Sequence, residues 1–159
     1  MIQRLNPVPA DRNAIARAVA ADEKDIEPNC QVDVPPLVPA GDYEVAFVRV
    51  EEKKLWGRSR AFLHFRVIQP GEHFGVVLFM AVTLPANGHF SLSSKYLQQW
   101  SLAAGKRPSR RDRLTTRVFR NKVFLGRVRT VTNDHDSKER EVTWHYSVID
   151  RLVEVRVGI

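Results

Sequence analysis

The segment 60–68 alternates between side chains that bind phosphates or stack on flat rings and side chains that fill a core. Because neighbouring side chains of a β-strand point to opposite faces, we expect one face to carry Arg60, Phe62, His64 and Arg66. Cations on such a face can follow the phosphates of a single-stranded nucleic acid, while a ring stacks on a base and contributes roughly 1–3 kcal/mol. The alternative is that Phe62 packs beneath the N-terminal residues while the arginines stay solvated.

Further candidates flank this segment on both sides. Trp56 lies in the charged segment 51–60, which is predicted to be a turn, and it either stacks on a base or folds inward as a core anchor. Residues 117–129 add cations, and we expect at least two of Arg117, Arg120, Lys122, Arg127 and Arg129 to reach the phosphates. We assign Phe119, Trp144 and Tyr146 to the core. The predicted nucleic-acid-binding set is Lys54, Trp56, Arg58, Arg60, Phe62, His64, Arg66, Arg117, Lys122, Arg127 and Arg129.

The positive charge is concentrated in one stretch of the chain. The formal net charge is +7, and residues 105–129 alone carry 10 basic side chains and 1 acidic one. Such a block attracts polyanions, because each neutralised phosphate releases counterions. The alternative is a solvated basic face that only keeps the protein in solution.

Catalytic and metal sites are not expected. The five histidines are dispersed, without metal-ligand spacing, and the sequence has no phosphate-cradling loop or serine-hydrolase motif. Residues 133–136 hold two carboxylates and an imidazole, but a hairpin turn explains that composition. A metal-dependent nuclease needs carboxylates near the basic stretch, which contains only Asp112. We therefore expect no enzymatic activity, no cofactor and no metal.

The chain has the features of a soluble cytoplasmic protein. Its single cysteine, Cys30, forms no intrachain disulfide, and residues 1–25 lack the apolar run of a signal peptide. The longest apolar run, near residues 75–80, is far shorter than the roughly 20 residues of a membrane-spanning helix.

The pattern predicts three strands, one helix and two strands. Strands are expected at 43–48, 60–68 and 76–83, the last apolar on both faces and therefore central or covered. A helix is expected from Ser93 or Ser94 to Ala104, ended by Gly105. Strands follow at 118–131, bent near Gly126, and at 142–148, with 152–157 as an extension after the polar turn 133–140. This order predicts a mainly β fold, a five-stranded OB-fold-like Greek-key barrel with one helix between strands 3 and 4. Another small barrel or a sandwich is the alternative.

The first 38 residues differ from the rest. A thin apolar stripe predicts a short helix between Asp11 and Asp25, and four prolines between 28 and 39 favour an extended linker. We interpret 1–38 as an N-terminal arm, partly helical or disordered, and 39–159 as the OB-fold-like nucleic-acid-binding domain. The arm is acidic, which suggests that it lies over the basic face when no nucleic acid is bound.

Four segments resemble the single-stranded-DNA-binding OB-fold proteins of phages and mobile elements. They are PAGDYEV at 39–45, RAFLHFRV at 60–67, SKYLQQW at 94–100 followed by Ala104 and Gly105, and VFLGRV at 123–128. The resemblance spans about residues 39–153 and implies largely sequence-independent binding of single-stranded DNA in replication or recombination. The chain departs from such proteins at its end, Glu154 to Ile159, which is not an acidic tail. Recruitment of partners through such a tail is therefore in doubt.

Three alternatives concern the partner. A protein-interaction module, an inhibitor or adaptor, would bind an acidic protein through the same basic face. RNA would be bound by the same physics as DNA, and only contacts to the 2′-hydroxyl would separate the two. A homodimer through an edge strand stays open.

Overall fold

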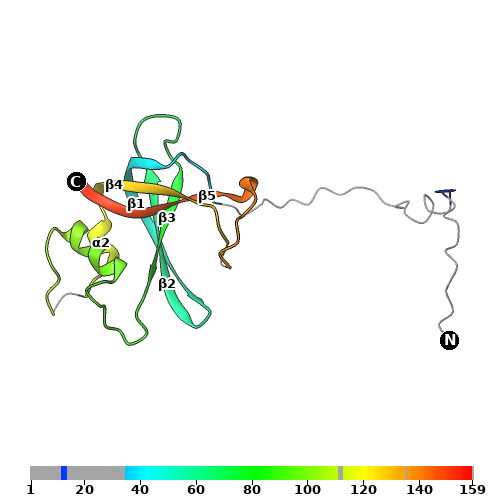
Figure 1. Ribbon diagram of the computed structural model, residues 1–159. Helices are drawn as coiled ribbons and strands as arrows, with labels where there is room; N and C mark the ends of the chain where they lie inside the picture. The colour runs from blue at the N-terminus through cyan, green and yellow to red at the C-terminus, as the bar shows by residue number, and fades with distance from the viewer. Residues whose placement is uncertain (1–11, 14–34, 111–112, 135, 159) are drawn as a thin grey trace, which may run out of the picture. The chain divides into compact units, whose positions relative to one another are not determined.

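The computed structural model describes residues 12–13, 35–110, 113–134 and 136–158 (Figure 1). The chain divides into two units, Met1–Val32 and Asp33–Ile159, and the elements that follow belong to the second unit. In chain order they are the strands β1 (Gly41–Leu55), β2 (Arg58–Val67) and β3 (Val77–Thr83), the helix α2 (Lys95–Ala104), the 3-10 helix η1 (Thr116–Phe119), β4 (Lys122–Val131), the 3-10 helix η2 (Val142–Trp144) and β5 (Tyr146–Gly158). The expected order of three strands, one helix and two strands is confirmed.

The five strands form one antiparallel sheet in the order β3-β2-β1-β4-β5 (Figure 1). β1 is central: its first half pairs with β4, from Gly41 opposite Val128 to Ala46 opposite Val123. It pairs with β2 from Val45 to Leu55. β3 was expected to be central or covered: it is not central, because it is an edge strand of the sheet, but both of its faces are buried or half-buried from Val77 to Val82.

The sheet is not closed into a barrel, and this corrects the expected OB-fold-like Greek-key barrel. The edge strands β3 and β5 approach each other at Phe79 and Tyr146, whose ring centroids are 6.3 Å apart, without joining one ladder. Gln99 of α2 occupies part of the free edge of β5. Its side-chain carbonyl accepts the backbone N–H of Leu152 in β5, and its amide nitrogen donates to the Leu152 carbonyl at 3.4 Å. These are the groups that a neighbouring strand would use.

The β1–β2 hairpin is longer than the sequence suggested. The segment 51–60 was expected to be a charged turn, but both strands continue through it and only Trp56 and Gly57 form the turn. Their φ angles are 49° and 74°, the two positive values that a tight type I′ hairpin turn requires. The charged residues suggested a turn, but they belong to strand ends that are exposed to water, where a strand needs no apolar alternation.

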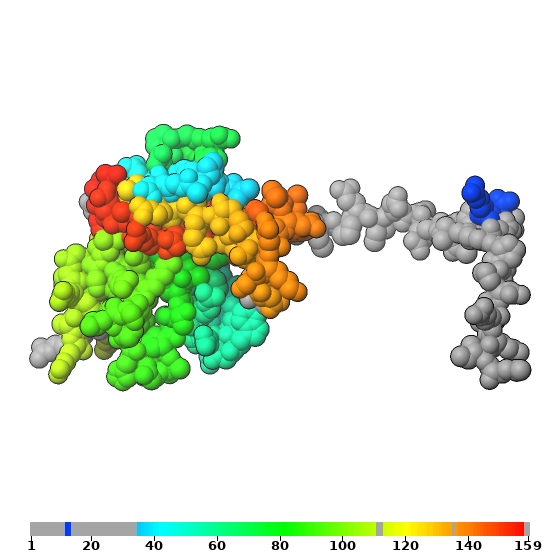
Figure 2. Space-filling view, in the orientation of Figure 1, coloured from blue at the N-terminus to red at the C-terminus, as the bar shows by residue number. Residues whose placement is uncertain are grey.

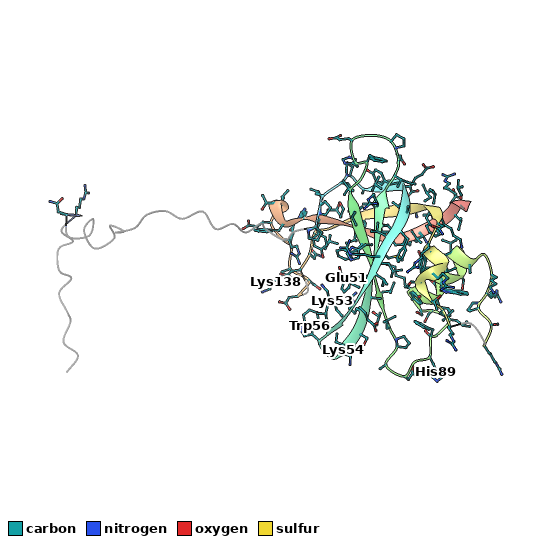
Figure 3. The ribbon with its side chains drawn as sticks, turned by 180° about the vertical axis from the view of Figure 1, so that it is seen from behind. Glu51, Lys53, Lys54, Trp56, His89 and Lys138 are labelled. Carbon is teal, nitrogen blue, oxygen red and sulfur yellow. The ribbon has the colours of Figure 1, made fainter. Side chains whose placement is uncertain are left out.

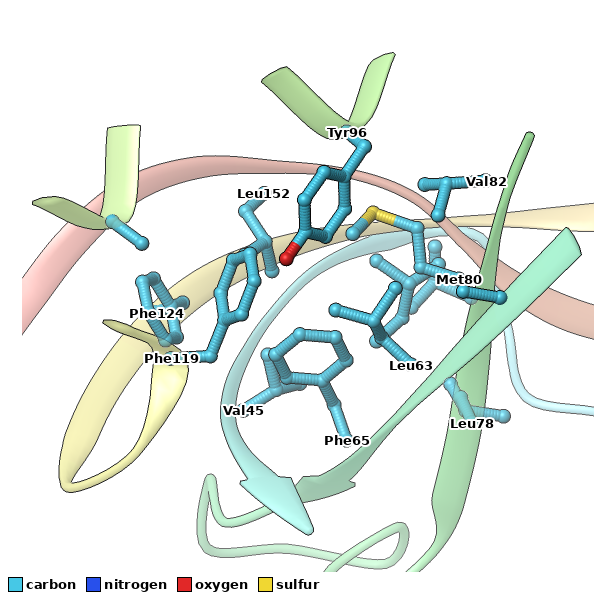
Figure 4. Packing of buried hydrophobic residues seen from close by; sticks show 14 of the residues in the cluster. Val45, Leu63, Phe65, Leu78, Met80, Val82, Tyr96, Phe119, Phe124 and Leu152 are labelled. Atoms are coloured by element: carbon cyan, nitrogen blue, oxygen red, sulfur yellow. The ribbon is translucent and has the colours of Figure 1, made fainter. Parts of the chain in front are cut away.

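The core consists of residues from all five strands, α2 and η1 (Figure 4). The predicted inward face of β2 is confirmed: Ala61, Leu63, Phe65 and Val67 are all buried. Phe65 meets Phe119 and Phe124 edge-on, at centroid distances of 6.3 and 6.2 Å. The expected burial of Phe119 is confirmed, but Phe119 belongs to η1, because β4 begins only at Lys122 and not at 118.

Helix α2 agrees closely with its prediction. Ser94 is the N-cap residue, and Gly105 ends the helix with a φ of 70°. The hydroxyl of Tyr96 donates to the Leu114 carbonyl, and the Trp100 indole donates to the Thr115 carbonyl at 3.2 Å. Two buried aromatic side chains of the helix therefore bind the backbone of the basic stretch 105–129 at Leu114 and Thr115.

The chain before Gly41 is tied to β5. Val38 is buried, its N–H donates to Ser147 Oγ at 2.8 Å, and that hydroxyl donates to the Val38 carbonyl at 2.8 Å. The core therefore includes Val38, one residue before the boundary we set at 39. The helix predicted between Asp11 and Asp25 lies outside the described residues, apart from the helical Arg12 and Asn13.

Candidate nucleic-acid interface

A basic and aromatic surface covers β1, β2 and β3 on the side opposite the core. In β2 it carries Arg60, Phe62 and His64, as the alternation predicted. Lys53, Glu51 and Arg49 of β1 stand directly opposite these three residues, and Phe79 of β3 stands opposite His64. We call this set the basic–aromatic face: Arg49, Glu51, Lys53, Arg60, Phe62, His64 and Phe79.

A β-bulge in β1 places three residues of this face on its outer side. Phe47 pairs with Phe65 and Arg49 pairs with His64, so Val48 is an extra residue in β1. Without it, Arg49 would point to the same side as the core residue Val45, because residues four apart share a face. The bulge therefore turns Arg49, and after it Glu51 and Lys53, from the core side to the outer side.

Phe62 lies at the centre of the face. The ammonium of Lys53 is 5.7 Å and the guanidinium of Arg60 is 5.9 Å from the centroid of its ring, within the range of cation–π attraction. Phe79 meets it edge-on at 5.4 Å, and Tyr146 continues the row at 6.3 Å from Phe79. The result is a row of three half-buried rings flanked by cations.

Glu51 pairs with two cations of the face, Arg49 and Lys53. Its carboxylate accepts a hydrogen bond from Arg49 Nε at 3.3 Å and lies 3.7 Å from Lys53 Nζ. The Arg49 hydrogen bond lowers the pKa of Glu51; slight burial opposes this, and the nearby charges of His64, Lys53 and Arg49 lower it further. Glu51 is therefore ionised at neutral pH and offsets part of the positive charge.

His64 contributes a ring rather than a charge near neutral pH. Burial lowers its pKa, Arg49 and Lys53 lower it further, and Glu51 opposes them. The buried His64 Nε2 and Arg60 Nε have no hydrogen-bond partner within the part of the chain that the structure describes. Unpaired buried polar atoms are costly, and because both atoms are shielded from solvent, a polar partner reaches them only after their side chains shift.

The β1–β2 hairpin extends the face to one end of the unit. Trp56, at its tip, is 80% exposed, so it is not a core anchor. A hollow lies beneath the tip, lined by Leu55, Trp56, Arg58, Arg60 and Thr83. Figure 2 shows the hairpin (teal) and the segment after β3 (green) at the same end, where Figure 3 labels Trp56 and His89.

The structure places the other predicted residues away from Phe62. Lys54 points to the opposite side of the hairpin from Lys53, and Arg66 is exposed near the other end of β2. Arg117 lies in η1, and Lys122 donates to the Ala103 carbonyl at 2.6 Å, at the end of α2.

Two further predicted arginines are paired with carboxylates. Arg127 Nε lies 3.1 Å from Asp42, and this hydrogen bond raises the Arg127 pKa. Arg129 Nε lies 3.1 Å from Asp150. Neither guanidinium is free to take a phosphate without sharing it with a carboxylate.

Sequence reasoning missed several members of the surface. Arg49 was passed over because its position lies on the core side by simple alternation. Phe79 was overlooked because β3 is apolar on both faces. Tyr146 and Trp144 were assigned to the core; instead, Tyr146 is half-buried against Phe79, with the Arg140 guanidinium 5.4 Å from its ring, and Trp144 is 44% exposed.

Among the described residues, no three His, Cys, Asp or Glu side chains gather as a metal site would require. No helix in the same part of the chain is long and apolar enough to cross a membrane.

No protein-family model, curated protein or solved structure matches the chain.

Proposed function

We propose that the protein binds single-stranded DNA through the basic–aromatic face, largely without sequence preference and without catalysing a reaction. The observation that carries the proposal is Phe62, a half-buried ring with Lys53 and Arg60 within 6 Å of its centroid. Bases stack on such rings whatever their identity, while the cations beside them attract the phosphates.

The architecture supports the same proposal. Three strands, a helix and two strands, with β1 between β2 and β4, are compatible with an OB-fold-like arrangement whose edges approach without pairing. In that fold, oligonucleotides bind over strands 2 and 3, and the loops after strands 1 and 4 flank them. Here β2 and β3 carry Phe62 and Phe79, while Trp56 and Arg140 lie in those two connections.

The proposal is tested by comparing two phenylalanines. Phe62→Ala removes the central ring, and we expect binding of a labelled thymidine oligonucleotide to weaken by about 1–3 kcal/mol. Phe74→Ala is the matched control, because Phe74 is 62% exposed and lies beyond Val67, at the end of β2 opposite Trp56. Equal affinities of the two variants would remove Phe62 from the site.

The same titration separates the alternatives. An RNA oligonucleotide of the same length that binds more tightly would assign the face to RNA. If neither nucleic acid binds at low salt, the face would have to be explained by an acidic protein partner instead.

A further inference from the structure

The sheet opens between β3 and β5, and the first residue of α2 lies in that opening. Lys95 lines two hollows: one with Arg60, Ala81 and Thr83 on the β3 side, the other with Asp150 and its neighbours on the β5 side. We call the first hollow the Lys95 pocket. Its lining also includes His89 and the hydroxyl-bearing Ser91 and Ser94.

The Lys95 pocket carries surplus positive charge. Burial lowers the pKa of Lys95, Asp150 opposes this, and the charges of Arg129 and Arg60 lower it further. Asp150 is already paired with Arg129 at 3.1 Å. Lys95 therefore interacts with two other cations and one carboxylate, and a further anion would relieve the repulsion among the cations.

The pocket is continuous with the basic–aromatic face. Ala81, in its wall, stands directly opposite Phe62 in the β2–β3 ladder, and Thr83 stands opposite Arg60. Arg60 belongs to both places: its guanidinium is 5.9 Å from the Phe62 ring, and its buried Nε has no hydrogen-bond partner among the residues described. A strand with a base on Phe62 would therefore bring a neighbouring phosphate to the pocket.

We propose that the Lys95 pocket binds a backbone phosphate of the same DNA strand whose base stacks on Phe62, with Arg60 and Lys95 as its cationic ligands. This inference rests on the proposed function and adds the path that the DNA strand follows across the surface. The strand runs from the tip of the hairpin, across β2 and the end of β3, into the opening that the unpaired edge of the sheet leaves beside α2.

The test is the salt dependence of binding for the full chain and three variants. Lys95→Met removes the charge and keeps most of the packed stem, Lys95→Arg keeps the charge, and Lys54→Met removes the same charge from the opposite side of the hairpin. The probe is a labelled thymidine oligonucleotide, and the readout is the slope of log K against log salt. Thermal unfolding checks each variant, and Lys95→Gln replaces Lys95→Met if the latter does not fold.

We expect the Lys95→Met slope to be shallower than that of the parent by about 0.7, the value for one phosphate on a single strand, with roughly tenfold weaker binding at low salt. Lys95→Arg and Lys54→Met should keep the parent slope. If the parent binds and the slope of Lys95→Met equals that of the parent, the pocket assignment is wrong while the proposed function stands. If the parent itself does not bind, the proposed function fails.

Discussion

Replacing Glu51 with glutamine should strengthen binding, a direction that accidental damage to a binding site rarely produces. Glu51 is the acidic member of the basic–aromatic face and lies 3.3 Å from Arg49 and 3.7 Å from Lys53. A phosphate that pairs with either cation comes to about 6 Å from the carboxylate, where like charges in water repel by roughly RT, a factor of about three in affinity. Removing the carboxylate charge also frees both cations for the phosphate.

The assay is a titration of a labelled thymidine oligonucleotide at low salt, because screening hides surface charges at high salt. Glu52→Gln is the matched control: it makes the same change in net charge one residue away, opposite Ala61 on the other side of β1. We expect Glu51→Gln to bind about threefold more tightly than the parent and Glu52→Gln to gain less. Equal gains would show that only net charge matters, and a loss in Glu51→Gln would refute the assigned face.

Two further predictions concern residues that hold the fold. Ser147→Ala leaves the buried N–H and C=O of Val38 without their 2.8 Å partners, so the free energy of unfolding in urea should fall by about 2–4 kcal/mol. Ser101→Ala, which removes a half-buried hydroxyl from α2, should cost less. Lys122→Met removes the bond to the Ala103 carbonyl and should lower stability by about 1–2 kcal/mol. Its oligonucleotide affinity should stay close to that of the parent, and a loss as large as that of Lys95→Met would place Lys122 in the phosphate path.

The face of β2 could be predicted because its two sides meet different surroundings. One side of β2 fills the core with residues 61, 63, 65 and 67, and the other side, with 60, 62, 64 and 66, does not. The residue types therefore alternate, and this alternation can be seen in the sequence. Helix α2 was equally clear, since its stop at Gly105 and its buried aromatic side chains are local signals.

The rest of the face depends on contacts between distant segments. The extra residue Val48 reverses the alternation of β1, and only pairing with β2 reveals it. Counting the charges in residues 105–129 also could not reveal the acidic partners of two arginines. Arg127 pairs with Asp42, 85 residues away, and Arg129 pairs with Asp150, 21 residues away. Gln99 bonds to Leu152 at the open edge of β5, and no pattern in the sequence reports this contact.

The most direct measurement is fluorescence anisotropy of a labelled thymidine oligonucleotide titrated with the full chain at two salt concentrations, with duplex DNA as competitor. The basic–aromatic face predicts binding that weakens steeply with salt and that duplex DNA does not displace, because a duplex cannot offer its bases to Phe62. Absence of binding at low salt, or full displacement by duplex, would contradict the assignment of this face to single-stranded DNA.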